Sequence, residues 1–396
     1  MIVRPSPVVA TVEACDAALS PLTGWSVLAL LSDPTDPRLP PLSRVDVVQP
    51  ALFAMGIGLA AAWRALGVEP DAVVGHSQGE VTAAVVASAL SLEDGARVVV
   101  ARSRAVLCCT HKGGMALLER PVAEVERLIQ AYSGALSIAA VNTASSTVVS
   151  GEADAIAALV SDLANTSVFC RRIEVDYASH SPHVSDLLPA LQAELAGLMP
   201  REARLRFYSS LLGGPVKGHE LDGRYWCRNL REPVRFDRAL ASLLAEGHGV
   251  FIETSPHPIL ALALTGASTD ALVLGSLRRG EGDLSLLLKG LGTLFAHGSP
   301  ARWDAVVNRH GPTAPELPPY PFERQRFWPD GAQKRADVDT AGLAAAEHPW
   351  LGARTSLARG GDLFTGRLSL ALFPWLAGHQ VFEPLLVPGT GLHDPA

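Results

Sequence analysis

Apolar positions between residues 50 and 110 form two helix-length segments with a short apolar run between them. The segments 50–66 and 78–90 are apolar on nearly every side, as helices are when they pack between a sheet and neighbouring elements. The run Ala72-Val73-Val74 between them is expected to be a strand. This alternation predicts an α/β core in which a parallel sheet carries helices on its faces.

The pattern changes between residues 113 and 180. Four strand-like segments and two helix-like segments follow one another in the order βαββαβ, which is the ferredoxin-like arrangement. The strands are expected at 115–118, 136–141, 147–150 and 169–175, and the helices at 122–131 and 154–165. An apolar strand of the earlier type returns at Val250-Phe251-Ile252, so we interpret the βαββαβ segment as an insertion into the larger unit.

Proline and polar residues divide the remaining third of the chain. Five prolines between 312 and 321 predict a stiff, extended tether, and residues 331–346 are polar and alanine-rich. Strand-like character at 364–372 begins another unit that is too short to close a core alone. The predicted divisions are a large subdomain at 1–112 and 181–295, a small subdomain at 113–180, a linker at 296–345 and a further unit at 346–396.

Composition excludes several classes of function. The 396 residues are 48% hydrophobic and carry a formal net charge of -7, which does not favour binding to nucleic acid or to an anionic membrane. The five cysteines form no C-x-x-C pair and no even set, so neither a zinc site nor a disulfide framework is expected. No signal peptide is recognisable at the N-terminus, and the uncharged run 47–63 fits a buried helix. These features predict a soluble, cytoplasmic protein without a bound metal or cofactor.

The strongest local signal for catalysis is the run Gly75-His76-Ser77-Gln78-Gly79-Glu80, between an expected strand and an expected helix. In that setting the glycines allow a sharp turn that exposes the Ser77 hydroxyl at a helix N-terminus. The alternative is an ordinary tight turn with a capping serine. A nucleophilic serine requires a base, and among twelve histidines His180 lies where the inserted segment returns to the large unit. Most histidines are ordinary surface or core residues, so His180 is one candidate among several.

Four motifs in the same order resemble those of polyketide synthase acyltransferase domains, which are relatives of bacterial malonyl-CoA:acyl carrier protein transacylase. The resemblance extends over residues 10–330. It rests on residues 75–80 (GHSQGE), 175–183 (VDYASHSPH), 225–234 (YWCRNLREPV) and 253–258 (ETSPHP). By this resemblance the large subdomain is expected to be α/β-hydrolase-like, with the ferredoxin-like subdomain inserted into it.

The resemblance also implies the roles of the catalytic residues. Ser77 is expected to be the nucleophile and His180 the general base and acid, and the backbone carbonyl of Asn229 is expected to orient the imidazole in place of an aspartate. Arg102, 25 residues after the serine, resembles the arginine that holds the free carboxylate of the substrate. Without the resemblance, Arg102 would be assigned to a solvated helix face.

Further motifs resemble those that select the acyl unit. Gln49, in the run RVDVVQ, resembles the active-site glutamine of the family; together with Gln78, Tyr177 and Ser179 it matches domains that select methylmalonyl-CoA rather than malonyl-CoA. A small residue at 179 leaves room for the α-methyl group, although a single methyl discriminates by only ~1 to ~3 kcal/mol. The acceptor implied is the phosphopantetheine thiol of an acyl carrier protein, with a ketosynthase as a neighbouring domain.

The C-terminal segment carries two more resemblances. Residues 317–328 are similar to the tether that follows such acyltransferases, and residues 348–352, 374–379 and 388–390 are similar to the start of a β-rich, hot-dog-type dehydratase. His379 stands at the position of the dehydratase histidine, but Glu383 interrupts the family pattern and the chain ends before the catalytic aspartate. We therefore expect His379 to be a vestige without dehydratase activity.

The N-terminal segment departs from the family. Members begin with a strand and a Gly-Gln-Gly-Ser-Gln turn that supplies one oxyanion-hole amide, and neither precedes Val12. The Gln78 amide alone would then serve, and one lost donor costs about a hundredfold or more in rate. Two alternatives to an active acyltransferase therefore stand at this point. One is an inactive fragment of a synthase, and the other is a serine hydrolase or thioesterase. Its acid would precede the histidine, and Asp154, Asp162 and Asp176 do so, but none stands at an obvious strand end of the large unit.

Overall fold

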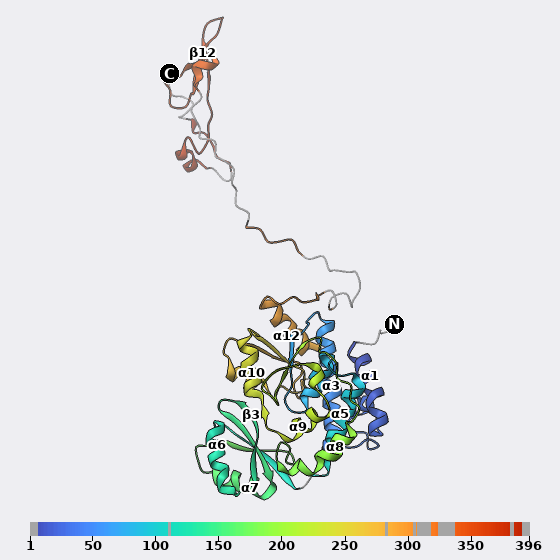
Figure 1. Ribbon diagram of the computed structural model, residues 1–396. Coiled ribbons are helices and arrows are strands. Elements are labelled where there is room, and N and C mark those ends of the chain that lie inside the picture. Colours follow the sequence, from blue (N-terminus) through green and yellow to red (C-terminus); the bar gives the residue numbers. More distant parts are fainter. Residues whose placement is uncertain are drawn as a thin grey trace. The chain divides into compact units, whose positions relative to one another are not determined.

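The computed structural model describes residues 7–109, 112–281, 284–303, 306, 318–323, 337–380 and 384–389. The chain divides into two compact units, Met1–Ala314 and Pro315–Ala396 (Figure 1). The division falls inside the stretch that the sequence predicts to be a linker. His379 belongs to the second unit. All other candidate site residues belong to the first unit.

The longest helix of the first unit, α3, packs against α1, α2, α4 and α5. By length and composition α3 passes the test for a membrane span, with a mean hydropathy of 1.6 over 18 residues, but 67% of that window is buried inside the fold. The prediction of a buried helix is thus confirmed. The helices outside the small subdomain are α1 (Pro7–Thr23), α2 (Val27–Ser32), α3 (Val45–Ala65), α4 (Gly79–Val86), α5 (Leu92–Leu107), α8 (Leu188–Glu194), α9 (Gly223–Arg231), α10 (Phe236–Ala245), α11 (Ala261–Ala267) and α12 (Leu284–Ala296).

Two helix boundaries differ from the predicted ones. Helix α3 begins at Val45 rather than at Pro50, because the buried residues of its first turns, Val45 and Val47, extend the apolar surface toward the N-terminus. Helix α4 ends at Val86 rather than at residue 90. Ser88 has a φ of 63°, a left-handed conformation that stops a helix.

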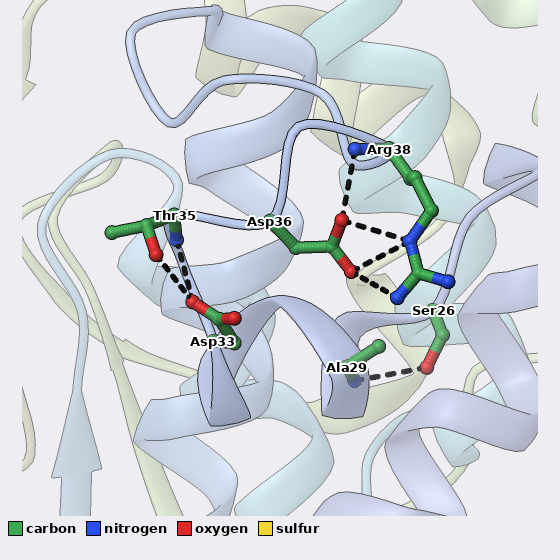
Figure 2. A network of polar contacts seen from close by, with 6 residues as sticks. All are labelled: Ser26, Ala29, Asp33, Thr35, Asp36 and Arg38. Atoms are coloured by element: carbon green, nitrogen blue, oxygen red, sulfur yellow. Dashed lines mark hydrogen bonds and ion pairs between the residues drawn. The ribbon is translucent and has the colours of Figure 1, made fainter.

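The loop between α2 and α3 is organised by its own acidic side chains (Figure 2). Asp33 accepts hydrogen bonds from the N–H and the hydroxyl of Thr35, at 3.0 and 2.6 Å. Asp36 accepts from the backbone N–H and the guanidinium of Arg38, with a shortest distance of 2.6 Å. These local contacts shape the loop that leads into α3, the helix that carries Gln49.

The described strands of the large subdomain include two parallel pairs, as the α/β prediction requires, but the pairs belong to two separate sheets. Strand β1 (Ala72–Val74) pairs in parallel with β6 (Arg206–Ser209), and β9 (Val250–Glu253) pairs in parallel with β10 (Leu272–Gly275). A third strand, β7 (Gly214–Val216), joins β6 in antiparallel orientation. Ser77 follows directly from the carboxyl end of β1, the end at which ligands bind in parallel sheets.

The small subdomain has the predicted βαββαβ order and is drawn in green in Figure 1. Its sheet has the strand order β5-β2-β4-β3-β8, and the last strand, β8 (Val234–Arg235), comes from outside the predicted insertion and lies parallel to β3. Ile156 and Leu159 on the second helix are fully buried against this sheet. The elements are β2 (Gly113–Leu118), α6 (Val122–Ile129), β3 (Leu136–Thr143), β4 (Ser146–Glu152), α7 (Ala153–Leu163) and β5 (Cys170–Ile173).

The second unit contains a small antiparallel sheet, β11 (Ala344–Ala345), β12 (Ala353–Ser356) and β13 (Asp362–Thr365). The predicted strand at 364–372 is wrong beyond Thr365, where the chain continues without regular structure and enters a turn. Rings of Trp350 and Trp375 pack at 5.3 Å, and Trp375 contacts His379 edge-on at 5.6 Å. The side chain of His379 is exposed.

Candidate active site

The turn that carries Ser77 is a strained strand-to-helix connection, as predicted. Ser77 has a φ of 55°, in the left-handed region that few side chains adopt. A Cβ atom on Gly75 would stand 2.2 Å from the backbone nitrogen of Glu80, so only glycine fits there. Gly79 meets no such obstacle. The sharp reversal therefore rests on Gly75 and presents Ser77 at the start of α4.

Three residues that the sequence singled out meet at the Ser77 hydroxyl. Ser77 Oγ lies 2.8 Å from His180 Nε2, and Arg102 Nη2 donates a hydrogen bond to the same oxygen at 2.8 Å. Ser77 comes from the turn before α4, Arg102 from α5 and His180 from the loop after the small subdomain. The prediction that Arg102 could belong to a solvated helix face is wrong, because its side chain is 2% exposed.

His180 is held by two carbonyl groups at the C-terminal end of α9. Its backbone N–H donates to the carbonyl of Leu230 at 2.9 Å, and its Nδ1 lies 2.8 Å from the carbonyl of Glu232. A carbonyl can only accept, so Nδ1 carries the proton and Nε2 is free to accept the proton of Ser77. The orienting carbonyl is therefore that of Glu232, and the prediction of the Asn229 carbonyl is wrong. Glu232 follows the last turn of α9 in extended conformation, which turns its carbonyl out of the helix toward the ring.

The imidazole is neutral at physiological pH. Burial and, to a smaller extent, the nearby charge of Arg102 lower the pKa of His180 to about 3, against the opposing hydrogen bond to Glu232. A neutral imidazole is the form that a general base needs at the start of the reaction. His180 also has a positive φ of 59°, so both members of the pair occupy unusual backbone conformations, a feature common at reaction centres.

Three buried polar atoms of the site residues have no partner among the described residues. They are Arg102 Nε, Gln49 Oε1 and Asn229 Oδ1. Burial lowers the pKa of Arg102 to about 10, with Tyr177 and Glu80 opposing, so the guanidinium keeps its charge at neutral pH. The amide of Gln49 is hydrogen-bonded to the Tyr177 hydroxyl. Burial raises the pKa of Tyr177, and this hydrogen bond opposes that rise. Buried donors and acceptors without partners are costly, so these atoms indicate a place for a polar ligand.

The remaining predicted residues surround the same point. Ser179 is buried, and its carbonyl accepts a hydrogen bond from Ser150 Oγ at 2.7 Å. Gln78 is the N-terminal cap residue of α4, immediately after the nucleophile. Gly113 lies so close to Tyr177 and Ala178 that a Cβ atom would stand 2.6 Å from the Ala178 nitrogen. The small subdomain thus fixes the course of the loop that carries Tyr177, Ser179 and His180.

Among the described residues no acidic side chain is hydrogen-bonded to the His180 ring as a triad acid would be. His180 Nδ1 donates to a backbone carbonyl, so the position that a triad aspartate would occupy is taken. Of the three candidate acids, Asp162 accepts a hydrogen bond from Tyr132 at 2.7 Å within the small subdomain. For His379, the predicted interruption at Glu383 lies outside the described residues.

Sequence reasoning missed two contacts of the turn. His76 Nε2 lies 2.9 Å from Asn142 Oδ1, which joins the nucleophile turn to β3 of the small subdomain. Glu80 is completely buried among donors from α9 and from the turn after β6. Glu80 was visible in the motif, but Asn142 stands in no recognisable pattern.

The fold and the site define the class of the first unit as an acyltransferase of mixed α/β architecture. The family described as "Acyl transferase domain" matches residues 4–301, and the chain belongs to this family. A second family, described as "Polyketide synthase dehydratase domain", matches residues 348–396. The C-terminal strands are consistent with the start of such a dehydratase domain.

The relatives are modular polyketide synthases. Polyketide synthase GfsB of Streptomyces halstedii is 49% identical over 403 residues, and mycoketide-CoA synthase of Mycobacterium tuberculosis is 41% identical over 393 residues. These alignments cover 99% and 97% of this chain but only 7% and 9% of the relatives. The chain is therefore similar to a short part of each synthase.

Solved structures give the same assignment of fold. The acyltransferase domain from module 8 of the salinomycin polyketide synthase has a TM-score of 0.72 and 42% identity, covering 75% of this chain and 71% of that one. A loading acyltransferase from the avermectin synthase has a TM-score of 0.71 and 42% identity, covering 74% and 92%. Malonyl CoA-acyl carrier protein transacylase of Coxiella burnetii, 22% identical with a TM-score of 0.63 over 72% and 90%, shares the fold.

Proposed function

We propose that this chain transfers a methylmalonyl unit from CoA to the phosphopantetheine thiol of an acyl carrier protein, by way of an ester on Ser77. The supporting observation is the meeting of a serine hydroxyl, a neutral imidazole and a buried guanidinium at one oxygen. The family match to acyltransferases points the same way. The location proposed is the cytoplasm, beside a ketosynthase and other synthase domains.

In the first half-reaction Ser77 Oγ attacks the thioester carbonyl as His180 Nε2 takes its proton. The carbon–oxygen bond forms, the carbon–sulfur bond breaks, and the proton passes from His180 to the departing CoA sulfur. In the second half the carrier thiol gives its proton to His180 and attacks the ester, and Ser77 recovers the proton. We assign the stabilisation of the oxyanion in both steps to the backbone N–H of Gln78, the residue after Ser77 at the start of α4.

The free carboxylate of the substrate is assigned to Arg102. Its Nε has no acceptor among the described residues, and a planar guanidinium binds a carboxylate through two parallel hydrogen bonds. The Gln49 amide lies beside the Tyr177 hydroxyl, and we place both at this carboxylate or its α-carbon. A neutral acyl chain would leave the buried cation unpaired, which disfavours it.

The choice of methylmalonyl over malonyl rests on the loop before His180. Ser179 is a small residue held by the contact of its carbonyl with Ser150, so the loop cannot easily move to fill the space of an α-methyl group. The expected discrimination is modest, because one methyl group contributes about 1 to 3 kcal/mol. Malonyl-CoA is therefore expected to be a slower substrate rather than a rejected one.

Intact-mass spectrometry after incubation with methylmalonyl-CoA tests this function. The expected result is a covalent adduct of one methylmalonyl group that is absent from the Ser77→Ala variant and removed by a carrier protein bearing phosphopantetheine. Absence of any Ser77-dependent adduct would instead support an inactive fragment. Steady hydrolysis of simple neutral esters would support a hydrolase.

A further inference from the structure

Glu80 lies in the first turn of α4, three residues after Ser77, and is 0% exposed. Its Oε1 accepts hydrogen bonds from the backbone N–H and hydroxyl of Ser210 and from the next backbone N–H at 3.3 Å. Its Oε2 accepts from the Tyr225 hydroxyl at 2.5 Å and from Asn229 Nδ2 at 2.9 Å. A buried carboxylate requires donors on both oxygens, and this one has five.

Helix α9 connects this carboxylate to the base. Asn229 Nδ2, besides donating to Glu80, lies 3.4 Å from the carbonyl oxygen of Ser77. The carbonyls of Leu230 and Glu232, one and three residues further along, hold the backbone and the ring of His180. The same end of one helix therefore contacts the nucleophile turn through side chains and the imidazole through its backbone.

We propose that Glu80 is a positioning residue that fixes the Ser77 turn to α9, and so sets the distance between the serine hydroxyl and His180 Nε2. This inference rests on the proposed function, since it concerns the reactivity of Ser77. Glu80 makes no hydrogen bond to Ser77, His180 or Arg102 side chains among the described residues. Its effect on the reaction is carried by Asn229 and Tyr225.

The donors around Glu80 favour a charged carboxylate over an amide of the same shape. Burial raises the pKa of Glu80, and hydrogen bonds from Tyr225 and Ser210 oppose that change. In the variant Glu80→Gln, the new side-chain NH2 group would face Asn229 Nδ2, which is also a donor. Asn229 Oδ1, an acceptor, has no partner among the described residues. The amide of Asn229 would turn over to present Oδ1, and the contact with the Ser77 carbonyl would be lost.

The test measures the rate at which a fluorophosphonate modifies Ser77, with methylmalonyl-CoA as a second substrate. The variants are Glu80→Gln, the double variant Glu80→Gln with Asn229→Asp, and Leu159→Ala. The double variant keeps one carboxylate and one amide with their positions exchanged, but an aspartate at position 229 has no N–H for the Ser77 carbonyl, so it separates the pairing with residue 80 from the contact with the turn. Leu159→Ala lowers stability by leaving a cavity in the core of the small subdomain, and it controls for a general loss of stability.

If Glu80→Gln does not fold, Tyr225→Phe replaces it, because that change removes a single donor.

We expect the inactivation rate constant of Glu80→Gln to fall about tenfold or more. The half-saturating probe concentration should stay the same, because the lost contact matters only in the transition state. The double variant stays as slow as Glu80→Gln, because an aspartate at position 229 cannot donate to the Ser77 carbonyl, and Leu159→Ala stays within about twofold of wild type. Wild-type reactivity in Glu80→Gln, or an equal loss in Leu159→Ala, overturns the proposal. No labelling of wild type by the probe also overturns it. Labelling by the probe without acylation by methylmalonyl-CoA refutes the proposed function instead, and the probe rates then decide the role of Glu80.

Discussion

At the scale of single residues, the charge of Arg102 is the feature that separates this site from that of a serine esterase. A buried guanidinium with an unpaired Nε favours an anionic substrate, because desolvation of the cation is offset only by a bound anion or by nearby negative charge. Among the groups near it, Tyr177 and Glu80 alone oppose the lowering of its pKa. The substrate carboxylate would complete this environment.

Replacing Arg102 by alanine should therefore change which acyl-CoA is used. Methylmalonyl-CoA and propionyl-CoA differ only by the carboxylate, so they form a matched pair. We expect Arg102→Ala to lower kcat/KM for methylmalonyl-CoA about a hundredfold or more, and kcat/KM for propionyl-CoA by less than about tenfold. Measurement of Ser77 acylation rates with both thioesters checks this. An equal decrease for both would mean that Arg102 acts on the serine and not on the carboxylate.

His180 should make the stability of the fold depend on acidity. Its pKa is lowered from 6.5 to about 3, so between these values the unfolded chain binds a proton that the folded chain does not. Stability is then full above about pH 6.5 and decreases as the pH falls, by about 1.4 kcal/mol per pH unit for one such group. Urea unfolding of wild type and His180→Gln from pH 8 to pH 4.5 checks this. A stability difference between the two proteins that does not vary with pH would contradict it.

At the scale of elements, the sequence predicts well what local patterns encode. The strand, turn and helix around Ser77 were predicted because glycine spacing and apolar runs are local signals, and the βαββαβ order followed from alternating strand and helix patterns. The start of α3 was missed because Pro50 suggested a first turn, whereas burial of Val45 and Val47 extends the helix. A local rule there yielded to tertiary packing.

Contacts between distant elements were beyond the reach of the sequence. Assigning the orienting carbonyl to Glu232 instead of Asn229 requires the position at which α9 ends relative to His180, which no motif specifies. The pairing of β8 with β3 joins residues almost a hundred positions apart. Ser77, His180 and Arg102 were identified together because the resemblance to a family supplied their common location, not because their spacing implied it.

At the scale of the whole acyltransferase unit, the candidate site lies where two lobes meet, and one hydrophobic cluster with residues of both lobes, such as Ala140 and Phe236, joins them. The large subdomain supplies Ser77 and Arg102, and the loop that returns from the small subdomain supplies His180. The contact of His76 with Asn142 joins the residue next to the nucleophile to β3, and the ring of His76 also packs against Phe236 at 5.6 Å. Relative movement of the lobes would therefore disturb this contact and change the distance between Ser77 and His180.

Removing that contact should weaken both stability and reactivity. In Asn142→Ala the half-buried His76 Nε2 loses its partner, which costs about 1 kcal/mol, because a partly desolvated polar group is left unpaired. We expect a lower urea midpoint and slower acylation of Ser77 by methylmalonyl-CoA, since the turn gains freedom relative to His180. Thr143→Ala, the next residue of β3, removes only an exposed hydrogen bond to Ser145 and is the control. Two results would contradict this prediction. Either both variants lose the same stability, or Asn142→Ala is destabilised but is acylated at the wild-type rate. In each case the two lobes do not position Ser77 through this contact.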